Sequence, residues 1–318
     1  MSQAMNEVEG LFFRQFSGVD IGEVPLVFIL GSPRTGTTLV YQVLINLFGF
    51  FYFSNLVNDH FTKFPVPGVA LSLQLDPQRP VSYESEYGKT QGYFGPSEGS
   101  LLFRKWFGGE HPSQTRSCEV LTDQREHLVL TMKSIYGLTG KPILTKNAWN
   151  CFRIRNLVGL FPKTVFIWVR RDIRLSAFSD LKARYAKGSP TIWNSATTSN
   201  YLEIQKRPYW EQVVEQQYEY NQSIARDLDQ FCANQYLEMW YEDLCDDPEG
   251  QLERIRRFLI PRDLGIRNRE SSMPRLRQST RHSAAEEDYL KICGHVGRTP
   301  DRFRSHTHSG GVSEEKAV

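Results

Sequence analysis

A glycine-bearing turn between an apolar run and a helical pattern most constrains how this chain folds. Residues 24–30 have the sequence VPLVFIL, which predicts a buried strand. Residues 31–38 have the sequence GSPRTGTT, and a helical pattern follows them as far as about residue 48. Backbone amides and the positive end of a helix are exposed at such a turn, so it is suited to hold a phosphate-like anion.

The same alternation of apolar, β-rich runs with helical patterns recurs along the chain. Further strands are expected at 142–145, 164–169 and 236–240. Further helices are expected at 152–160, 172–187 and 210–231. This alternation is typical of βαβ units, and it predicts an α/β fold of one domain, with a P-loop-like central parallel sheet flanked by helices on both faces.

The chain outside this alternation predicts less regular structure. Residues 50–117 are rich in Pro, Gly and aromatic side chains and show little periodicity, which predicts loops that shape a substrate site. We expect a short N-terminal segment, a main domain, a substrate-shaping insertion within that domain, and a flexible tail. Their respective bounds are 1–23, 24–298, 50–130 and 299–318.

Charge and cysteine content exclude several classes of protein. The formal net charge of the 318 residues is +2, so a bound anion must be held by local contacts. No cysteine lies in a CxxC or zinc-type spacing, which predicts reduced thiols and no metal site. We expect a cytoplasmic protein without a membrane span, because neither a signal-peptide pattern nor about 20 consecutive apolar residues occurs. The five cysteines are Cys118, Cys151, Cys232, Cys245 and Cys293.

The turn at 31–38 nearly fits the P-loop pattern GxxxxGK[ST], but Thr37 stands where that pattern has lysine. Kinases and ATPases use this lysine on the β- and γ-phosphates, so its absence argues against γ-phosphoryl transfer. The cation of this turn is Arg34, whose guanidinium can donate two parallel hydrogen bonds to a phosphate or sulfate.

With Arg34 in that place, the turn resembles the 5'-phosphosulfate loop of the sulfotransferases that use PAPS (3'-phosphoadenosine 5'-phosphosulfate). The arginine form is similar to that of tyrosylprotein sulfotransferases and many bacterial members. The resemblance implies that PAPS is the co-substrate, that PAP is the product, and that the loop core binds the donor. That core is Pro33, Arg34, Thr35, Gly36, Thr37 and Thr38.

Three further segments match the same family. Arg171, at the end of the expected strand 164–169, and Ser179, eight residues later, have the spacing of the family's 3'-phosphate pair. Tyr241 begins a Tyr-Glu-Asp-Leu segment in which the family places a tyrosine beside the adenine. Lys146 matches the lysine that family members place near the bridging oxygen of the leaving group. Each of these residue types also occurs in ordinary structural roles, so the resemblance to the family depends on their occurring together.

The resemblance does not supply a general base for the in-line transfer. The position of the histidine in cytosolic sulfotransferases is occupied by Ala148, and residues 53–56 lack the glutamate of tyrosylprotein sulfotransferases. Two substitutes are present, Glu98 in a Gly-Pro-Ser-Glu segment and His60 beside an aspartate. Of the two, we rank Glu98 slightly ahead of His60 as the base. For each residue an ordinary role fits the sequence equally well, a salt bridge for Glu98 and a solvated side chain for His60.

The alternatives are a P-loop nucleotide kinase and a binder of nucleotides without catalytic activity. Nucleic-acid binding is less attractive, because no nucleic-acid motif accompanies the basic stretch from Arg262 to Arg281. The sequence leaves open whether this stretch contacts the 3'-phosphate of the donor.

The expected acceptor is a hydroxyl or amine of a small molecule such as a secondary metabolite, of a lipid or of a carbohydrate. Aromatic residues that belong either to its pocket or to the core are Tyr52, Phe53, Phe64, Tyr87, Tyr93, Phe94 and Trp106. The sequence does not indicate an oligomeric state.

Overall fold

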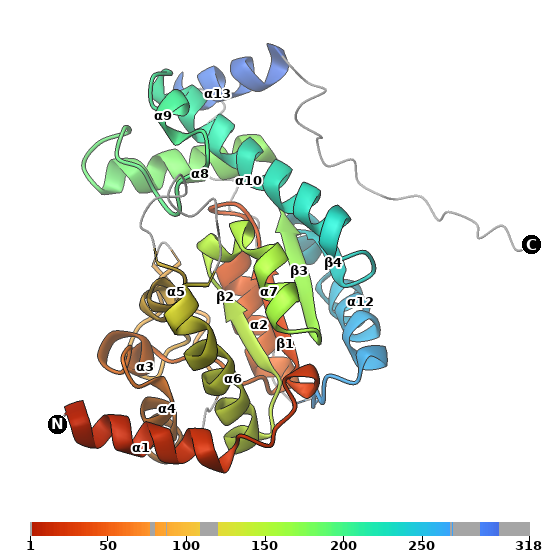
Figure 1. The fold of residues 1–318 in the computed structure, drawn as a ribbon. Coiled ribbons are helices and arrows are strands. Elements are labelled where there is room, and N and C mark those ends of the chain that lie inside the picture. Colours follow the sequence, from red (N-terminus) through yellow and green to blue (C-terminus); the bar gives the residue numbers. More distant parts are fainter. Residues whose placement is uncertain are drawn as a thin grey trace, which may run out of the picture.

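The fold is taken from a computed structural model, which describes residues 2–76, 80–86, 88–108, 120–267, 269 and 287–298. The expected tail at 299–318, Cys118, Tyr87 and most of the basic stretch beyond Arg262 lie outside the described residues. Figure 1 shows a central sheet with helices packed around it.

Four parallel strands form this sheet in the order β2-β1-β3-β4. Their bounds are β1 Leu26–Leu30, β2 Ile143–Lys146, β3 Thr164–Arg170 and β4 Tyr236–Trp240. The α/β class, the parallel sheet and all four strands predicted from the sequence are therefore confirmed. Because the strands are parallel, their carboxyl ends meet at one edge of the sheet.

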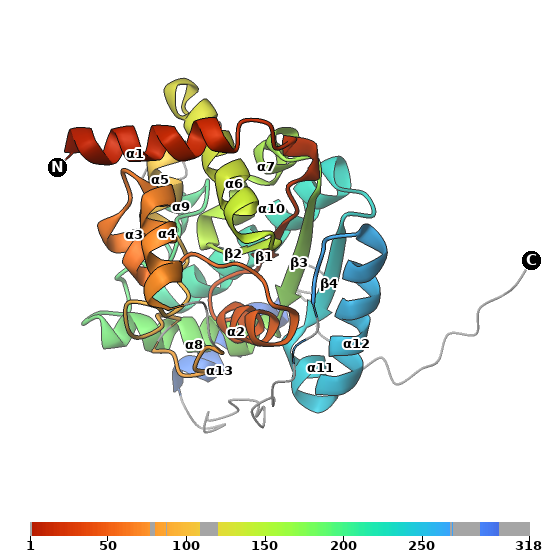
Figure 2. The same cartoon turned by 90° about the horizontal axis from the view of Figure 1, so that it is seen from below.

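Successive residues of β1 face the two sides of the sheet and belong to two different cores. Leu26, Phe28 and Leu30 pack with helices on one side, whereas Val27 and Ile29 pack with helices on the other. The first side is covered by α6 Arg125–Thr139, α7 Ile154–Leu160 and α10 Tyr209–Phe231. The second is covered by α2 Thr37–Phe48, α11 Tyr241–Asp246 and α12 Pro248–Leu259, as Figure 2 shows.

The region expected to consist of loops, 50–117, contains helices, so that prediction is wrong in part. They are α3 Asn55–His60, α4 Pro65–Leu75 and α5 Ser100–Phe107. Helix α4 gives little amphipathic signal because most residues of its first two turns are buried, so apolar groups occur on several of its faces. Its Pro65 is tolerated because the first turn of a helix needs no backbone donor there.

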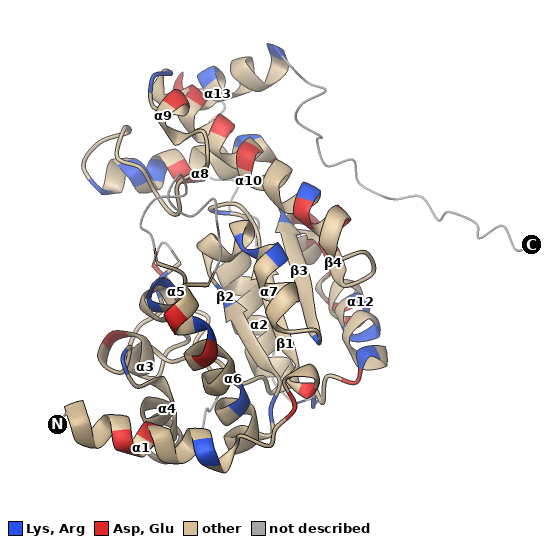
Figure 3. Cartoon of the chain, viewed as in Figure 1, with Lys and Arg blue, Asp and Glu red and all other residues tan. Residues whose placement is uncertain are grey.

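The remaining helices lie at the periphery. Helix α1 Ser2–Gln15 packs on α4 and α6, while α13 Glu287–Arg298 packs on α10 and on α8 Ile173–Ala186. Charges of both signs are interspersed over these helices, in line with the small net charge (Figure 3). Short elements complete the description, namely α9 Tyr201–Ile204, η1 Ile21–Glu23, η2 Thr122–Gln124, η3 Ala148–Phe152 and η4 Ile260–Arg262.

Candidate active site

A cavity of about 940 Å³ lies at the carboxyl edge of the sheet. The carboxyl end of each strand supplies residues to its wall. Gly31 follows β1, Lys146 ends β2, Arg171 follows β3 and Tyr241 follows β4. The predicted residues Pro33, Arg34, Gly36, Thr37, Thr38, Glu98 and Ser179 line the same cavity. The fold thus brings together almost all of the residues that the sequence indicated.

Close packing explains the glycines of the loop. A Cβ on Gly31 would lie 2.6 Å from the carbonyl oxygen of Val169, and a Cβ on Gly36 would lie 2.3 Å from the ring of Tyr241. Gly36 has φ of +87° and is the N-cap of α2. A larger residue here would be strained and would displace the tyrosine. Thr35, which is buried, donates from its hydroxyl to the carbonyl of Ser32 at 2.8 Å and so closes the turn.

The loop and the segment after β3 are joined by hydrogen bonds. The Nε of Arg34 donates to the Oγ of Ser179 at 3.1 Å, and Nη1 of Arg171 donates to the carbonyl of Arg34 at 3.0 Å. The guanidinium of Arg171 also lies 4.9 Å from the ring centroid of Tyr241. Two signatures that are 137 residues apart in the chain therefore form one polar surface.

Arg34 adopts a left-handed backbone conformation with φ of +68°, which is uncommon for a residue other than glycine. The buried amide of Gln217 on α10 donates to the carbonyl of Pro33 at 3.0 Å and supports this conformation. Backbone strain of this kind is found where the surroundings fix a functional side chain.

The start of α8 holds Arg171 and Ser179 in register. Asp172 is the N-cap and accepts a hydrogen bond from the backbone N–H of Arg174 at 2.8 Å. Burial alone would raise the pKa of Asp172, but hydrogen bonds from Arg174 and its charge outweigh burial, so the pKa lies below its usual 3.8. The backbone N–H of Asp172 donates to Oε1 of Glu242 at 3.0 Å, which ties this helix start to α11.

On the other side of the loop, Glu98 forms an ion pair with Lys146. The lysine side chain is 11% exposed and the glutamate side chain is 33% exposed, so the pair is partly shielded while the carboxylate still faces the cavity. Asn147 donates from Nδ2 to the Glu98 carbonyl at 3.1 Å, and the hydroxyl of Tyr41 donates to the Ser97 carbonyl at 3.2 Å. These bonds anchor the segment that carries Glu98 to β2 and α2.

His60 does not line the cavity. Its side chain is exposed, and its ring lies 5.8 Å from that of Tyr93. Asp59, the preceding residue, lines the cavity instead, because one step along a helix turns the side chain by about a quarter of a turn. Ala148, which occupies the histidine position of the cytosolic family, also lies in the cavity wall.

The aromatic residues divide between core and cavity. Phe53 and Trp106 are buried in the core on the α6 side of the sheet and Tyr52 in the core on its α2 side, whereas Tyr93 is 64% exposed and lines the cavity. Several polar wall residues were not identified from the sequence, because no short pattern shows which side chains of a turn, a helix or a loop face the cavity. These are Ser32, Asn55, Asn58, Asp59, Lys89, Thr90, Asn147, Lys187, Asn194 and Ser195.

The described part of the chain contains neither a cluster of metal-binding side chains nor a helix that could span a membrane. No three His, Cys, Asp or Glu side chains lie close enough there to hold a metal ion. None of the helices that are described combines the length and the apolar character needed to cross a membrane. The four described cysteines are free thiols, of which Cys151 and Cys232 are buried.

Comparison with known proteins agrees with this geometry. The profile of the sulfotransferase family matches residues 25–260. The omega-hydroxy-beta-dihydromenaquinone-9 sulfotransferases Stf3 of Mycobacterium bovis and Mycobacterium tuberculosis are each 25% identical over 347 aligned positions, covering 96% of this chain and 82% of the relative. Among solved structures, the sulfotransferase STF1 of Mycobacterium tuberculosis superposes with a TM-score of 0.50 at 13% identity. That superposition covers 94% of this chain and 81% of STF1, and it supports the fold.

Proposed function

Because the chain belongs to the sulfotransferase family and is therefore an enzyme of sulfuryl transfer, we propose that its donor is PAPS and that the cavity beside Arg34 is where transfer occurs. The observation that carries this proposal is the convergence of the loop, the Arg171 and Ser179 pair and the Lys146 and Glu98 pair on one cavity. The alternative of a P-loop nucleotide kinase is not favoured, since the matched family transfers sulfuryl groups.

The donor is held by groups at the strand ends. The backbone amides at the start of α2, the hydroxyls of Thr37 and Thr38 and the guanidinium of Arg34 are suited to the 5'-phosphosulfate. Arg171 and Ser179 are suited to the 3'-phosphate, and the ring of Tyr241 to the adenine, following the family resemblance.

Transfer requires a group that neutralises charge on the leaving oxygen and a group that removes a proton. Lys146 donates to the oxygen that bridges sulfur and phosphorus as that bond breaks, because negative charge develops there. Glu98 accepts the proton of the acceptor hydroxyl or amine as the new bond to sulfur forms, and releases it to solvent after the products leave. The ion pair of these two residues places the Glu98 carboxylate next to Lys146 in the cavity wall.

The acceptor we propose is the hydroxyl of a small molecule or lipid. The names of the two Stf3 relatives describe a lipid-like quinone with a terminal hydroxyl. In this chain the exposed side chains of Tyr93 and Leu101 border the cavity and offer an apolar contact surface next to Glu98.

Calorimetric titration with PAP tests the donor assignment. Arg34→Ala should weaken PAP binding by roughly 10- to 100-fold, the range for losing hydrogen bonds to a charged group. The control is Arg155→Ala, because Arg155 is exposed on α7 and does not line the cavity. Equal PAP affinity in the wild type, the Arg34 variant and the control would refute the assignment.

A further inference from the structure

Two lysines in the wall of the cavity have no part in the proposed donor site. Lys89 belongs to the segment before Glu98, and Lys187 follows the last residue of α8. They come from separate parts of the chain and line one cavity together with Arg34. Lys187 is eight residues beyond Ser179, which corresponds to about 12 Å along the axis of the helix that it follows.

The position of Lys89 is fixed close to the reacting groups. Its backbone N–H and C=O are bonded to the C=O and N–H of Glu86, each at 2.9 Å. The preceding residue, Gly88, lies against the proposed reaction site, since a Cβ there would be 3.3 Å from Oγ1 of Thr38 and 3.8 Å from Oε1 of Glu98. The backbone of Lys89 therefore lies at the acceptor side of the cavity.

The position of Lys187 is fixed by Asn194. The lysine Nζ donates to Oδ1 of Asn194 at 2.6 Å, and Nδ2 of Asn194 donates to Oδ1 of Asp180 at 2.7 Å. The carbonyl of Asn194 accepts a hydrogen bond from Nε2 of Gln216 at 2.8 Å. The Oδ1, the Nδ2 and the backbone carbonyl of Asn194 are thus all hydrogen-bonded, which holds Oδ1 toward Lys187.

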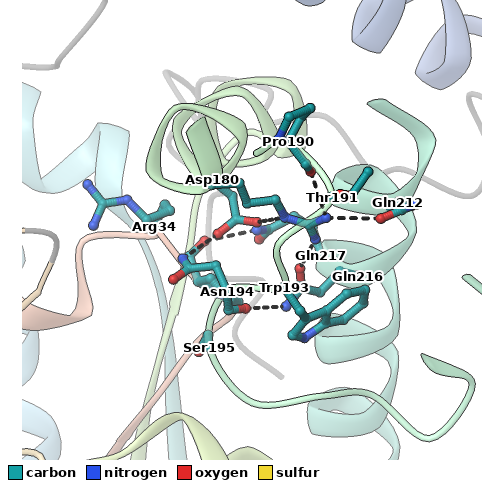
Figure 4. A network of polar contacts seen from close by, with 12 residues as sticks. Arg34, Asp180, Pro190, Thr191, Trp193, Asn194, Ser195, Gln212, Gln216 and Gln217 are labelled. Carbon is teal, nitrogen blue, oxygen red and sulfur yellow. Dashed lines mark hydrogen bonds and ion pairs between the residues drawn. The ribbon is translucent and has the colours of Figure 1, made fainter. Parts of the chain in front are cut away.

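Asn194 is joined to a buried ion pair through Asp180, which is labelled together with Asn194 in Figure 4. Asp180 and Arg184 are both 0% exposed, and Nε of Arg184 donates to Oδ2 of Asp180 at 3.2 Å. The remaining guanidinium nitrogens donate to Oε1 of Gln212 at 3.1 Å and to Oε1 of Gln216 at 2.8 Å. Buried pairs add little net stability, so the main result of this one is a fixed position for the segment that carries Asn194.

Charges of both signs lie near the ammonium group of Lys187. Burial lowers the pKa of Lys187, the Asp180 carboxylate raises it, and the nearby charges of Lys89 and Arg184 lower it further. Asp180 is already shared between Arg184 and Asn194. An anion between the two lysines would remove their mutual repulsion.

We propose that Lys89 and Lys187 form an anion subsite in the wall of the cavity, which binds a carboxylate, phosphate or sulfate group of the acceptor. The acceptor then carries two features, a nucleophilic hydroxyl or amine at Glu98 and an anionic group at the lysines. This inference rests on the proposed function, since it takes the Lys146 and Glu98 pair as the reaction site. The other source of such an anion is the donor's 3'-phosphate, for which Arg171 and Ser179 stand nearer the loop.

The test uses two phenols that differ only in charge, 4-hydroxyphenylacetate and its neutral amide, each titrated into the PAP-saturated enzyme. The carboxylate should bind about tenfold more tightly than the amide, as expected for a charge held by two lysines near the surface. In the Lys89→Gln/Lys187→Gln double variant this preference should fall below about twofold. The matched control is Lys182→Gln, which removes an exposed lysine of α8 that does not line the cavity.

The outcomes separate this inference from the proposed function. A wild type without preference for the carboxylate, or a double variant that keeps it, overturns the subsite. A double variant that loses PAP affinity as strongly as Arg34→Ala assigns the lysines to the donor and overturns the acceptor role. Failure of the proposed function appears elsewhere, as unchanged PAP binding in Arg34→Ala.

Asn194→Ala tests how Lys187 is positioned. We expect a partial loss of carboxylate preference with unchanged PAP affinity, because the lysine remains but is no longer held. Asn194→Gln, which keeps the amide, should restore part of the preference, whereas equal behaviour of both variants and the wild type would contradict the positioning role.

Discussion

The two sides of the cavity are built differently. On the donor side, Arg34, Arg171 and Tyr241 stand directly after parallel strands and contact one another across the loop. On the acceptor side, Glu98 and Lys89 lie outside the helices and strands, on a segment that several hydrogen bonds join to β2, α2 and the start of α3. The sheet therefore determines a rigid donor site. Changes in the loops can alter the acceptor site while the donor site stays the same.

The largest effect is expected from Glu98→Gln, which keeps the size of the side chain but removes its capacity to accept a proton. We expect kcat to fall by about 100- to 1000-fold, within the range for removing a general base. PAP affinity should stay within about twofold, since Glu98 belongs to the acceptor side. Steady-state kinetics and PAP calorimetry on the same variant measure both, and a kcat near wild type would remove Glu98 from the mechanism.

Gly36→Ala tests the donor side. The new Cβ would collide with the ring of Tyr241, and φ of +87° is unfavourable for alanine. We expect PAP to bind about tenfold more weakly, the size of losing one aromatic contact together with strain in the loop. Gly140→Ala is the matched control, because Gly140 also has positive φ but has no atom within 4 Å of an added Cβ. Equal PAP affinities for the two variants would contradict the packing argument.

Asp172→Ala should lower the free energy of unfolding by about 1 kcal/mol, the usual effect of losing an N-cap side chain. Because the folded-state pKa of Asp172 lies below 3.8, its contribution is complete above that pH and is lost as pH falls through the lower folded value. Urea unfolding at pH 7 and at pH 3 measures both stabilities. If the difference in free energy of unfolding between the wild type and the variant grew as the pH fell, the N-cap role of Asp172 would be contradicted.

The smallest effect is expected from His60→Ala. The ring is exposed and outside the cavity wall, so kcat and the KM of the acceptor should change by less than about twofold. A loss as large as that of Glu98→Gln would make His60 the base and reverse the ranking of the two residues.

The same contrast explains how much the sequence could predict. Arg34, Lys146, Arg171 and Tyr241 were identified by their resemblance to sulfotransferase motifs, which was recognisable because each residue lies beside an apolar strand with a local pattern. Lys187 was not identified, because its role depends on a hydrogen bond to Asn194 and on buried contacts with α10 that no short pattern encodes.

The helices of the 50–117 region were missed for a related reason. They are short, and α4 is buried on several sides, so the polar face that marks an amphipathic helix is weak. Glu98 was found by its neighbours in the sequence, while its ion pair with Lys146 depends on two segments that are 48 residues apart.

Product analysis by mass spectrometry tests whether PAPS is the donor and whether Arg34 belongs to its site. The wild-type enzyme and Arg34→Ala are incubated with PAPS and a metabolite extract, and mass spectrometry follows PAP release and products heavier by one sulfuryl group. We expect sulfated product and PAP to appear in equal amounts with the wild type, and both to be strongly reduced with Arg34→Ala. Equal product formation by the two proteins, or product formed without release of PAP, would contradict the assignment of the donor and its site.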